Sequence, residues 1–310
     1  MITLILPKLI RGVMTLLIAV TLVFLFIRLA GDPALVLAPP DAPPEVVEQV
    51  RQRLGLDQPL PVQYFNYLVG LVHGNFGYSV HTGRPAQDLF FERLPYTAVL
   101  GLVALGIAAL CGIALGTIAA LNHNSPLDRG LMAFSVFAFA MPNFFFGLVL
   151  ILIGALVFGN FFGGTGGAAN FGQVFAPAAT LGLASMGTFA RFTRSSLLET
   201  LNKPFMRAIE ARGVPYSRQL LCHAAPNAAI PIITILGLSL GGMVAGAVVT
   251  EQVFSWPGIG QLLIRSVQTR DIAVVQFIVI AVAFTMTACN IAVDFLHAFI
   301  DPRIRTARNG

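Results

Sequence analysis

The stretch Tyr96–Leu127 reads YTAVLGLVALGIAALCGIALGTIAALNHNSPL and contains no aspartate, glutamate, lysine or arginine. A helix that crosses the roughly 30 Å hydrocarbon core of a bilayer needs about 20 apolar residues, because each residue adds about 1.5 Å. This stretch is long enough for one crossing. It therefore predicts a membrane-spanning helix near 96–121.

Four other stretches lack charged side chains in the same way: residues 12–27, 130–190, 219–250 and 272–293. Residues 130–190 are long enough for two crossings, and they divide at residues 159–172, which are too rich in glycine and asparagine for a lipid-facing helix. The sequence thus predicts an all-α integral membrane protein. We expect its six spans near 9–29, 96–121, 132–158, 174–193, 230–251 and 273–297.

The composition excludes several other classes of protein. Of 310 residues, 56% are hydrophobic and 11% are charged, whereas a soluble domain carries about 25% charge. Cys111, Cys222 and Cys289 are too scattered for a disulfide framework or a metal site. Neither lysine, Lys8 or Lys203, follows a glycine, so the phosphate-binding Gly-Lys turn of a P-loop ATPase is absent.

The loop charges predict the orientation of the chain in the membrane. With the N-terminus inside, the inner segments hold 12 of the 19 lysines and arginines. The outer segments hold seven, together with nine acidic residues. Because inner loops are enriched in basic residues, both termini are expected in the cytoplasm. The first span could alternatively be a cleaved signal peptide, but Asp32-Pro33 follows it without a small-residue cleavage site.

Two connections are too long to be simple turns. Residues 30–95 form a predicted external segment with a short helix at 45–54 and an amphipathic stretch at 62–72. Residues 194–229 form an internal, basic segment. The predicted organisation is accordingly an N-terminal helix (1–29), the external segment (30–95), a transmembrane core (96–299) with an internal loop (203–228), and a tail (300–310).

The internal loop predicts two short helices. Pro204 can begin the first helix and Gly213 can end it, while Val214-Pro215 opens a second helix from Tyr216 to Cys222. Apolar faces with basic flanks suit a groove on a partner protein. They equally suit an interfacial loop that arginines anchor to anionic lipid.

A few features inside the predicted spans are candidates for a solute pathway. Met141-Pro142-Asn143 predicts a kink in the third span, which serves either a gate or packing. Glycines in the fifth span permit close approach, either along a pathway or in plain packing. Asp294 is explained by its place near the inner interface. The candidates for pathway or gate residues are Met141, Pro142, Asn143, Gly241, Gly242, Glu251, Trp256 and Pro257.

The internal loop also carries a motif, with Ala208 near its start, Gly213 six residues after Arg207, and Pro226 thirteen further on. This spacing resembles the cytoplasmic EAA loop of binding-protein-dependent ABC import permeases. Arg207 stands where that pattern has glutamate, so the acidic contact does not carry over. The resemblance assigns ATPase coupling to Arg207, Ala208, Glu210, Gly213, Val214, Pro215, Tyr216, Ser217, Arg218, Leu220, Leu221 and Pro226.

Further motifs lie in order along almost the whole chain, and they resemble the dipeptide, oligopeptide and nickel branch of these permeases. A departure at Pro226 from the arginine of many members leaves the subgroup open. The motifs are GLDQPLP at 55–61, GNFG at 74–77, RLP at 93–95, HAAPNA at 223–228, FSWPGIG at 254–260 and DPR at 301–303.

The resemblance implies the type I importer fold, with this chain forming half of a pore in a bacterial inner membrane. It implies a second permease subunit, two ATPase subunits (or one two-site ATPase) and an extracytoplasmic solute-binding protein as partners, with no nucleic acid. ATP and Mg would be held by the ATPases and no cofactor by this chain. Peptides are the expected solute, and glutathione or nickel chelates are the alternatives. A gate at Trp256 and Pro257 rests on the resemblance alone.

Two other classes of function are weaker. An ion-coupled carrier needs internal repeats and buried ion ligands, and the intramembrane ligands here are too few. A rhomboid-like protease would use Ser185 and His297, but the serine lacks the glycine two residues before it, and the histidine is at the inner edge of its span.

Overall fold

A computed structural model describes residues 2–29, 32, 34–35, 38, 41–53, 55–158 and 171–300. Regular secondary structure in these residues is helical, apart from one bridge between Tyr78 and Pro85. The chain divides into unit 1 (residues 1–95 and 262–287) and unit 2 (residues 96–261 and 288–310), and each is described by itself. The all-α membrane class predicted from the sequence is confirmed.

Unit 1 contains the N-terminal helix and the predicted external segment. Its helices are α1 (Ile2–Leu29), α3 (Pro44–Arg53) and α4 (Leu60–Val72). It also includes the first turns of α5 (Ala86–Leu121), most of α13 (Ile259–Gln268) and the first half of α14 (Ile272–Ile300). Helix α3 forms where the sequence predicts a short helix, and α4 forms over the stretch that the sequence describes as amphipathic. Helix α3 begins at Pro44, one residue before its predicted start, and α4 begins at Leu60, two residues before the start of its stretch.

The end of α1 is joined to α4 by an aromatic and polar contact. The Phe24 ring lies against the rings of Tyr64 and Tyr67, with centroids 5.2 and 5.6 Å apart. Arg28 donates to the Gln63 side chain at 2.9 Å.

Helix α3 is connected to the residues that follow α1 by an ion pair. Arg51 donates to Asp32, and this hydrogen bond lowers the pKa of the Asp32 carboxyl below its ordinary value. The external segment therefore packs on itself and on α1.

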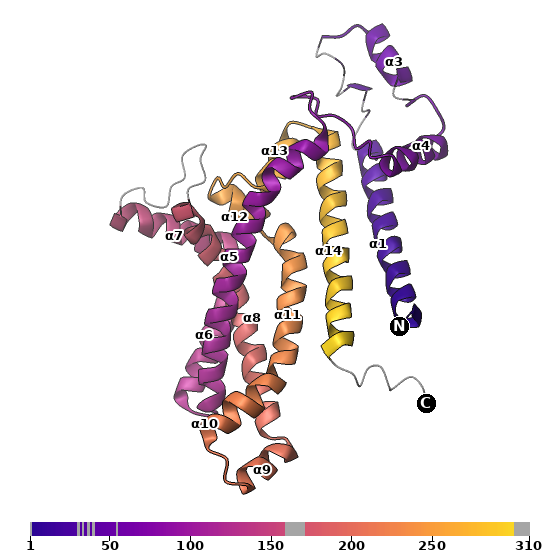
Figure 1. Ribbon diagram of the computed structural model, residues 1–310. Helices are drawn as coiled ribbons and strands as arrows, with labels where there is room; N and C mark the ends of the chain where they lie inside the picture. Colours follow the sequence, from indigo (N-terminus) through magenta and orange to yellow (C-terminus); the bar gives the residue numbers. More distant parts are fainter. Residues whose placement is uncertain are drawn as a thin grey trace. The chain divides into compact units, whose positions relative to one another are not determined.

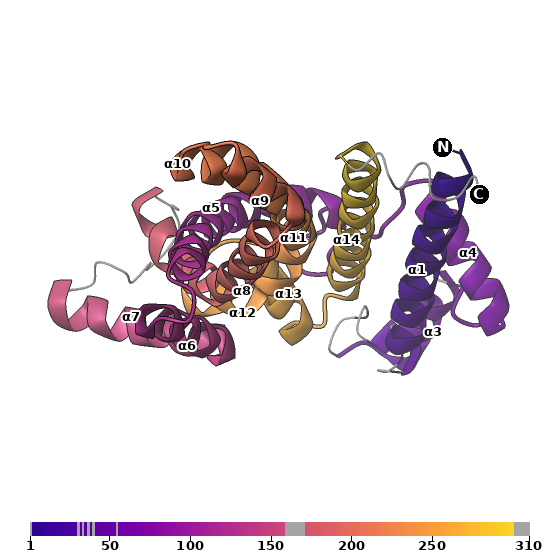
Figure 2. The ribbon, with the colours of Figure 1, turned by 90° about the horizontal axis from the view of Figure 1, so that it is seen from below.

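Unit 2 is a helical bundle built around α8 (Phe175–Leu201), with 14 of its 27 residues buried. Around it lie the rest of α5, α6 (Pro126–Ala140), α7 (Asn143–Phe158), α11 (Ala225–Gly246) and α12 (Val248–Val253). Figure 1 shows α12 toward one end of this bundle and α9 (Pro204–Ala211) with α10 (Tyr216–Arg218) at the other. In Figure 2 the bundle is seen from that second end, with α9 and α10 nearest the viewer.

Glycines allow the helices to approach α8 closely. A Cβ on Gly116 of α5 would lie 2.4 Å from the carbonyl oxygen of Ala190, and a Cβ on Gly187 of α8 would lie 2.2 Å from that of Ser135 on α6. No real side chain tolerates such distances. These contacts bring the backbones together as small residues do at helix interfaces in lipid.

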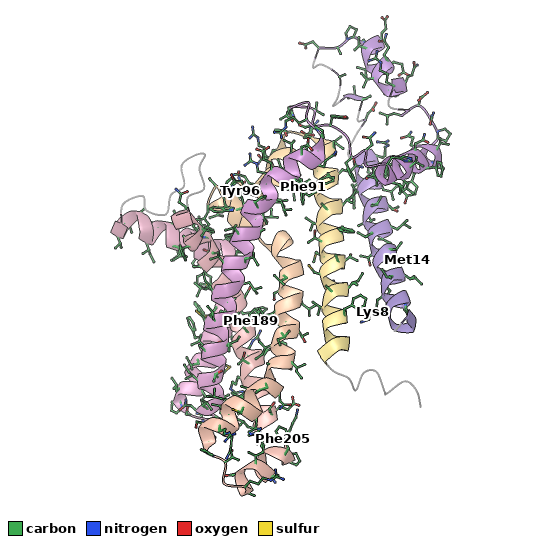
Figure 3. All side chains as sticks on the ribbon, viewed as in Figure 1. Lys8, Met14, Phe91, Tyr96, Phe189 and Phe205 are labelled. Carbon is green, nitrogen blue, oxygen red and sulfur yellow. The ribbon has the colours of Figure 1, made fainter. Side chains whose placement is uncertain are left out.

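Three buried clusters follow one another along α5 and α8. The first contains Leu100, Ala178 and Trp256, and the second contains Leu105, Phe189 and Ile232. The third contains Ala120, Leu197, Met206, Ala224 and Ala228, next to α9. Figure 3 shows Phe189 along the length of the bundle and Phe205 at its α9 end. The core of unit 2 therefore extends from the α12 end to the α9 end.

Length and apolarity single out four candidate spans among the described residues, or five if a bent helix pair counts as one. The four are Pro7–Phe26, Ala86–Leu121, Tyr216–Gly242 and Ile272–Val293. The pair is α6 and α7, whose axes differ by 99° across Met141 and Pro142, where the sequence predicts a kink. Helix α8 overlaps the predicted span at 174–193, but it is less apolar because it also carries Arg191, Arg194 and Glu199.

The predicted fifth span, 230–251, differs from the observed helices. The helix extends back to Ala225 and ends at Gly246, and α12 then begins at Val248. Some expectations lie outside the described residues. They are the glycine-rich residues 159–170, the side chains of Asp294 and His297, and residues 301–310 with the DPR motif.

Candidate functional site

The internal loop begins with the predicted helix at Pro204. Pro204 occupies the first turn of α9, where its missing N–H is not needed, and the helix ends at Ala211. Gly213 follows with φ of +73°, a left-handed conformation that glycine adopts without strain. Open space surrounds the position of its absent Cβ, so backbone conformation alone requires glycine here.

The second predicted helix does not end at Cys222. After α10, a π-helical turn (Gln219–Ala224) leads directly into α11, so one helical segment extends from Tyr216 to Gly246. No glycine or proline separates Cys222 from Ala225. Pro226 cannot donate a backbone hydrogen bond, and the wider π turn ends two residues before it, at Ala224. The loop and the following transmembrane helix are therefore continuous.

The loop presents two different faces. Met206 and Ala224 are buried against Ala120 of α5, Leu197 of α8 and Ala228 of α11. The opposite face is exposed: Phe205 is 37%, Tyr216 59% and Leu221 69% accessible. Four exposed basic residues surround these apolar side chains: Lys203, Arg207, Arg212 and Arg218.

The other predicted coupling residues lie on or beside the exposed face. The Val214 carbonyl accepts a hydrogen bond of 2.7 Å from the Gln219 side chain. Val214 and Leu220 are half-buried, and the exposed ones are Ala208, Glu210, Gly213, Pro215, Ser217 and Pro226.

An ion pair between buried Asp128 of α6 and half-buried Arg194 of α8 lies near the loop end. The sequence did not predict it: Arg194 counts there only as an inner charge, and Asp128 has no assigned role. Asp128 is 2% exposed and accepts two hydrogen bonds from Arg194, from Nε at 2.6 Å and from Nη2 at 2.7 Å. The Asn124 backbone N–H also donates to Asp128, and Ser125 caps the first turn of α6. The pair thus fixes the start of α6 on α8.

At the opposite end of unit 2, Glu251 of α12 is fully buried and joins three segments. Oε1 accepts from the Thr97 hydroxyl at 2.6 Å, and Oε2 accepts from the backbone N–H groups of Gly260 and Gln261 at 2.7 and 3.2 Å. Thr97 in turn accepts from the Ile259 N–H at 2.8 Å. The sequence suggests Glu251 as a pathway residue, whereas its described contacts all hold the 254–260 loop against α5.

Trp256 and Pro257 belong to this loop, but the tryptophan side chain is 6% exposed. Its Nε1 donates to the Tyr96 carbonyl at 3.0 Å, and its ring packs with Leu100 and Ala104. Among the described side chains, Trp256 is therefore part of the core of unit 2.

A cavity of about 250 Å³ lies between α5, α7, α8 and α11. It brings together Asn143 and Gly242, which the sequence singles out as pathway candidates. It also includes Ser185 and Ser239, which were not predicted for a pathway. The described lining does not include Met141, Pro142, Gly241, Glu251, Trp256 or Pro257. Among the described residues, the lining consists of Gly101, Ala104, Leu105, Asn143, Leu181, Ser185, Ser239 and Gly242.

The fold and sequence place this chain in a known family. Residues 112–306 match the family described as the inner membrane component of binding-protein-dependent transport systems, and residues 1–101 match the N-terminal domain of such membrane components. The chain belongs to this family, and it is a permease component of an ABC importer.

Particular relatives agree with this assignment. The chain is 39% identical to the glutathione transport system permease protein GsiC of Salmonella choleraesuis, over 98% of this chain and 99% of the relative. It is 38% identical to GsiC of Escherichia coli K12, with the same coverage.

Two solved transporters share the fold at low sequence identity. One is an amino acid ABC transporter with histidines (TM-score 0.53, 18% identity, 68% of this chain and 94% of that chain). The other is the inward-facing MetNI methionine ABC transporter (TM-score 0.56, 15% identity, 69% and 97%).

Proposed function

We propose that this permease converts ATP-driven movement of separate ATPase subunits into passage of a short peptide through the membrane. The observation that carries the proposal is the continuous helical segment from Tyr216 to Gly246. It begins in the exposed loop face, and it lines the cavity with Ser239 and Gly242. At about 1.5 Å per residue, Tyr216 and Ser239 are about 35 Å apart along the helix.

The loop face suits a protein partner. Exposed Tyr216 and Leu221 supply the apolar anchor, and the surrounding arginines supply charge that can steer an acidic groove. Burial of Met206 and Ala224 against three helices gives the loop a firm base, so a push on its outer face acts on the bundle. We assign this face to the ATPase subunits.

The partners and orientation follow from the same assignment. The loop, both termini and the residue 300–310 tail lie in the cytoplasm, and residues 30–95 lie outside, in accordance with the loop charges. A second permease completes the pore, two ATPase subunits or one two-site ATPase hold ATP and Mg, and a solute-binding protein delivers the solute. This chain has no ATP site of its own and acts in a bacterial inner membrane, with residues 1–29 and 96–299 as its membrane part.

Short peptides are the solute class that we propose, with glutathione as one member of that class. Glutathione is a peptide, and a permease named for glutathione transport is 39% identical to this chain along almost its whole length. The described residues contain no group of three or more histidine, cysteine or acidic side chains that could hold a metal ion. Nickel chelates, which bring their own metal ligands, are the alternative solute.

Reconstitution of the whole transporter in proteoliposomes tests the proposal. Uptake of labelled glutathione or trialanine should require ATP, the ATPase subunits and the binding protein. Gradient-driven uptake by this chain alone, without ATPases, would refute the proposal.

A matched pair of variants at Gly213 tests the loop. Gly213→Pro should reduce uptake more than tenfold, because proline fixes φ near −65° and cannot adopt +73°. Gly213→Asn, which tolerates that conformation, should keep most of the uptake. Normal uptake by Gly213→Pro would remove the coupling role of the loop. In a Ser217→Cys variant, a cysteine at this position that reacted with a label only from outside the cell would contradict the proposed cytoplasmic location of the loop.

A further inference from the structure

The cavity of unit 2 has an unusual combination of groups for a membrane interior. Its walls are apolar or glycine on α5, where Gly101, Ala104 and Leu105 line it. Three polar side chains enter from three other helices: Asn143 from α7, Ser185 from α8 and Ser239 from α11. No ionisable side chain is part of the described lining.

The three polar side chains have unused hydrogen-bonding capacity. No hydrogen bond joins Asn143, Ser185 or Ser239 to another side chain or backbone group among the described residues. By contrast, Ser135, Thr180 and Thr234 bond to carbonyls of their own helices, the usual arrangement for hydroxyls in apolar helices. Ser185 is exposed, and Asn143 and Ser239 are half-buried, so all three side chains can pair with a solute that enters the cavity.

We propose that this cavity is a solute-binding site that recognises the uncharged amide groups of a peptide. An amide presents one N–H donor and one carbonyl acceptor, and the side chains of asparagine and serine can each both donate and accept. A charged amine or carboxylate would find no counter-charge among the described lining residues. The termini and charged side chains of the peptide therefore lie outside the cavity.

The volume limits how much of the solute enters. Sites for drug-sized ligands occupy roughly 300–1,000 Å³, so a cavity of about 250 Å³ accommodates only a segment of about one or two residues. Recognition of a backbone amide is common to all peptides and independent of their side chains. The site therefore accepts many sequences, and the solute-binding protein makes the finer selection.

The cavity is also placed to change with the transport cycle. Ser239 and Gly242 belong to α11, which is continuous with the exposed loop, while Asn143 and Ser185 belong to α7 and α8. A shift of α11 along or about its axis separates Ser239 from the other two polar groups. Loop movement then lowers the affinity for the amide and releases it. This inference rests on the proposed function, because it assumes a peptide solute and a coupled loop.

Direct binding tests the site without the selectivity of the binding protein. The assembled transporter in nanodiscs, without its binding protein, is titrated with radiolabelled trialanine. Asn143→Ala, Ser185→Ala and Ser239→Ala should each weaken binding about three- to tenfold, the effect of losing one hydrogen bond. Ser195→Ala is the matched control, because Ser195 is exposed on α8 and absent from the lining. It should bind trialanine like the unchanged protein.

A second measurement uses the unchanged protein, so it does not depend on the folding of any variant. Trisarcosine, the N-methylated analogue of triglycine, lacks backbone amide N–H groups and should bind at least tenfold more weakly than triglycine. Equal binding of these two peptides, or unchanged trialanine affinity in all three variants, would overturn the site. ATP-driven peptide uptake without any measurable binding here would also overturn it, yet leave the proposed function intact. Absence of ATP-driven peptide uptake would instead reject the proposed function.

Discussion

The Thr97 hydroxyl donates a hydrogen bond of 2.6 Å to Oε1 of Glu251, although 154 residues separate the two along the chain. Thr97 is on α5, and Glu251 is on α12. Both are fully buried, and the same carboxyl group holds the backbone of Gly260 and Gln261. This contact therefore determines where the 254–260 loop lies on unit 2.

Removal of the Glu251 carboxyl group should destabilise unit 2. Glu251→Ala leaves the Thr97 hydroxyl and two backbone N–H groups without an acceptor, at a cost of about 1–3 kcal/mol for each buried group left unpaired. Glu251→Gln keeps one acceptor oxygen and should cost less. Thermal unfolding of the purified transporter in detergent should rank the unchanged protein as most stable, Glu251→Gln next and Glu251→Ala last.

The control for this comparison is Glu199→Ala, which removes an exposed glutamate whose pair with Lys203 is solvent-accessible. It should change stability by less than about 1 kcal/mol. Equal stability of Glu251→Ala and the unchanged protein would show that the carboxyl group does not hold the loop.

Gly258 should not tolerate even a methyl group. A Cβ there would lie 2.2 Å from Oε1 of Glu251, so Gly258→Ala must displace the carboxyl group or the loop. The matched substitution is Gly130→Ala on α6, where a Cβ meets no atom within 4 Å and alanine favours the helix. Only Gly258→Ala should lower the unfolding temperature.

The double variant separates a local clash from a general defect. Because Gly258 and Glu251 are in direct contact, the effects of Gly258→Ala and Glu251→Ala should be less than additive. Full additivity would contradict the contact.

The Asp128–Arg194 pair should be worth much more than an exposed pair. Asp128 is buried but the Arg194 side chain is 25% exposed, so Asp128→Asn, which removes the charge of a hydrogen-bonded carboxylate, should cost about 1–3 kcal/mol. Glu92→Gln breaks the exposed Arg84–Glu92 pair and should cost less than about 1 kcal/mol. Limited proteolysis between α5 and α6, together with thermal unfolding, measures both. Similar losses in the two variants would contradict the role of burial.

Local signals explain which parts of the site could be predicted. Pro204 and Gly213 determine where α9 begins and where the chain turns, and Pro142 marks the break between α6 and α7. These effects act within a few residues, so the printed sequence contains them. The helix pair of the loop was predicted for this reason.

The parts that could not be predicted depend on distant residues. Nothing near Glu251 indicates that Thr97 will meet it, and nothing near Asp128 indicates Arg194, because chain topology alone brings each pair together. The end of the second loop helix was also placed wrongly. No glycine or proline interrupts residues 219–225, and the helix continues from the π turn through Pro226.

The two faces of the loop should respond differently to the same kind of truncation. Tyr216→Ala and Leu221→Ala remove exposed side chains, so the chain should insert and unfold normally. Both variants should nevertheless retain fewer ATPase subunits on affinity purification and show lower ATP-driven uptake, because apolar anchors contribute much of the affinity of an interface.

Met206→Ala acts on the buried face instead. Met206 is 4% exposed, and truncation of a buried methionine to alanine costs about 2–5 kcal/mol, so this variant should unfold at lower temperature. Leu156→Ala on α7, a 77% exposed leucine away from the loop, is the control and should retain both stability and ATPase subunits. If Tyr216→Ala and Leu221→Ala retained the ATPases as Leu156→Ala does, the exposed loop face would not be their docking surface. The loop would then be an interfacial segment that its arginines hold on anionic lipid. In that case, substitution of the loop arginines should weaken binding to anionic lipid vesicles.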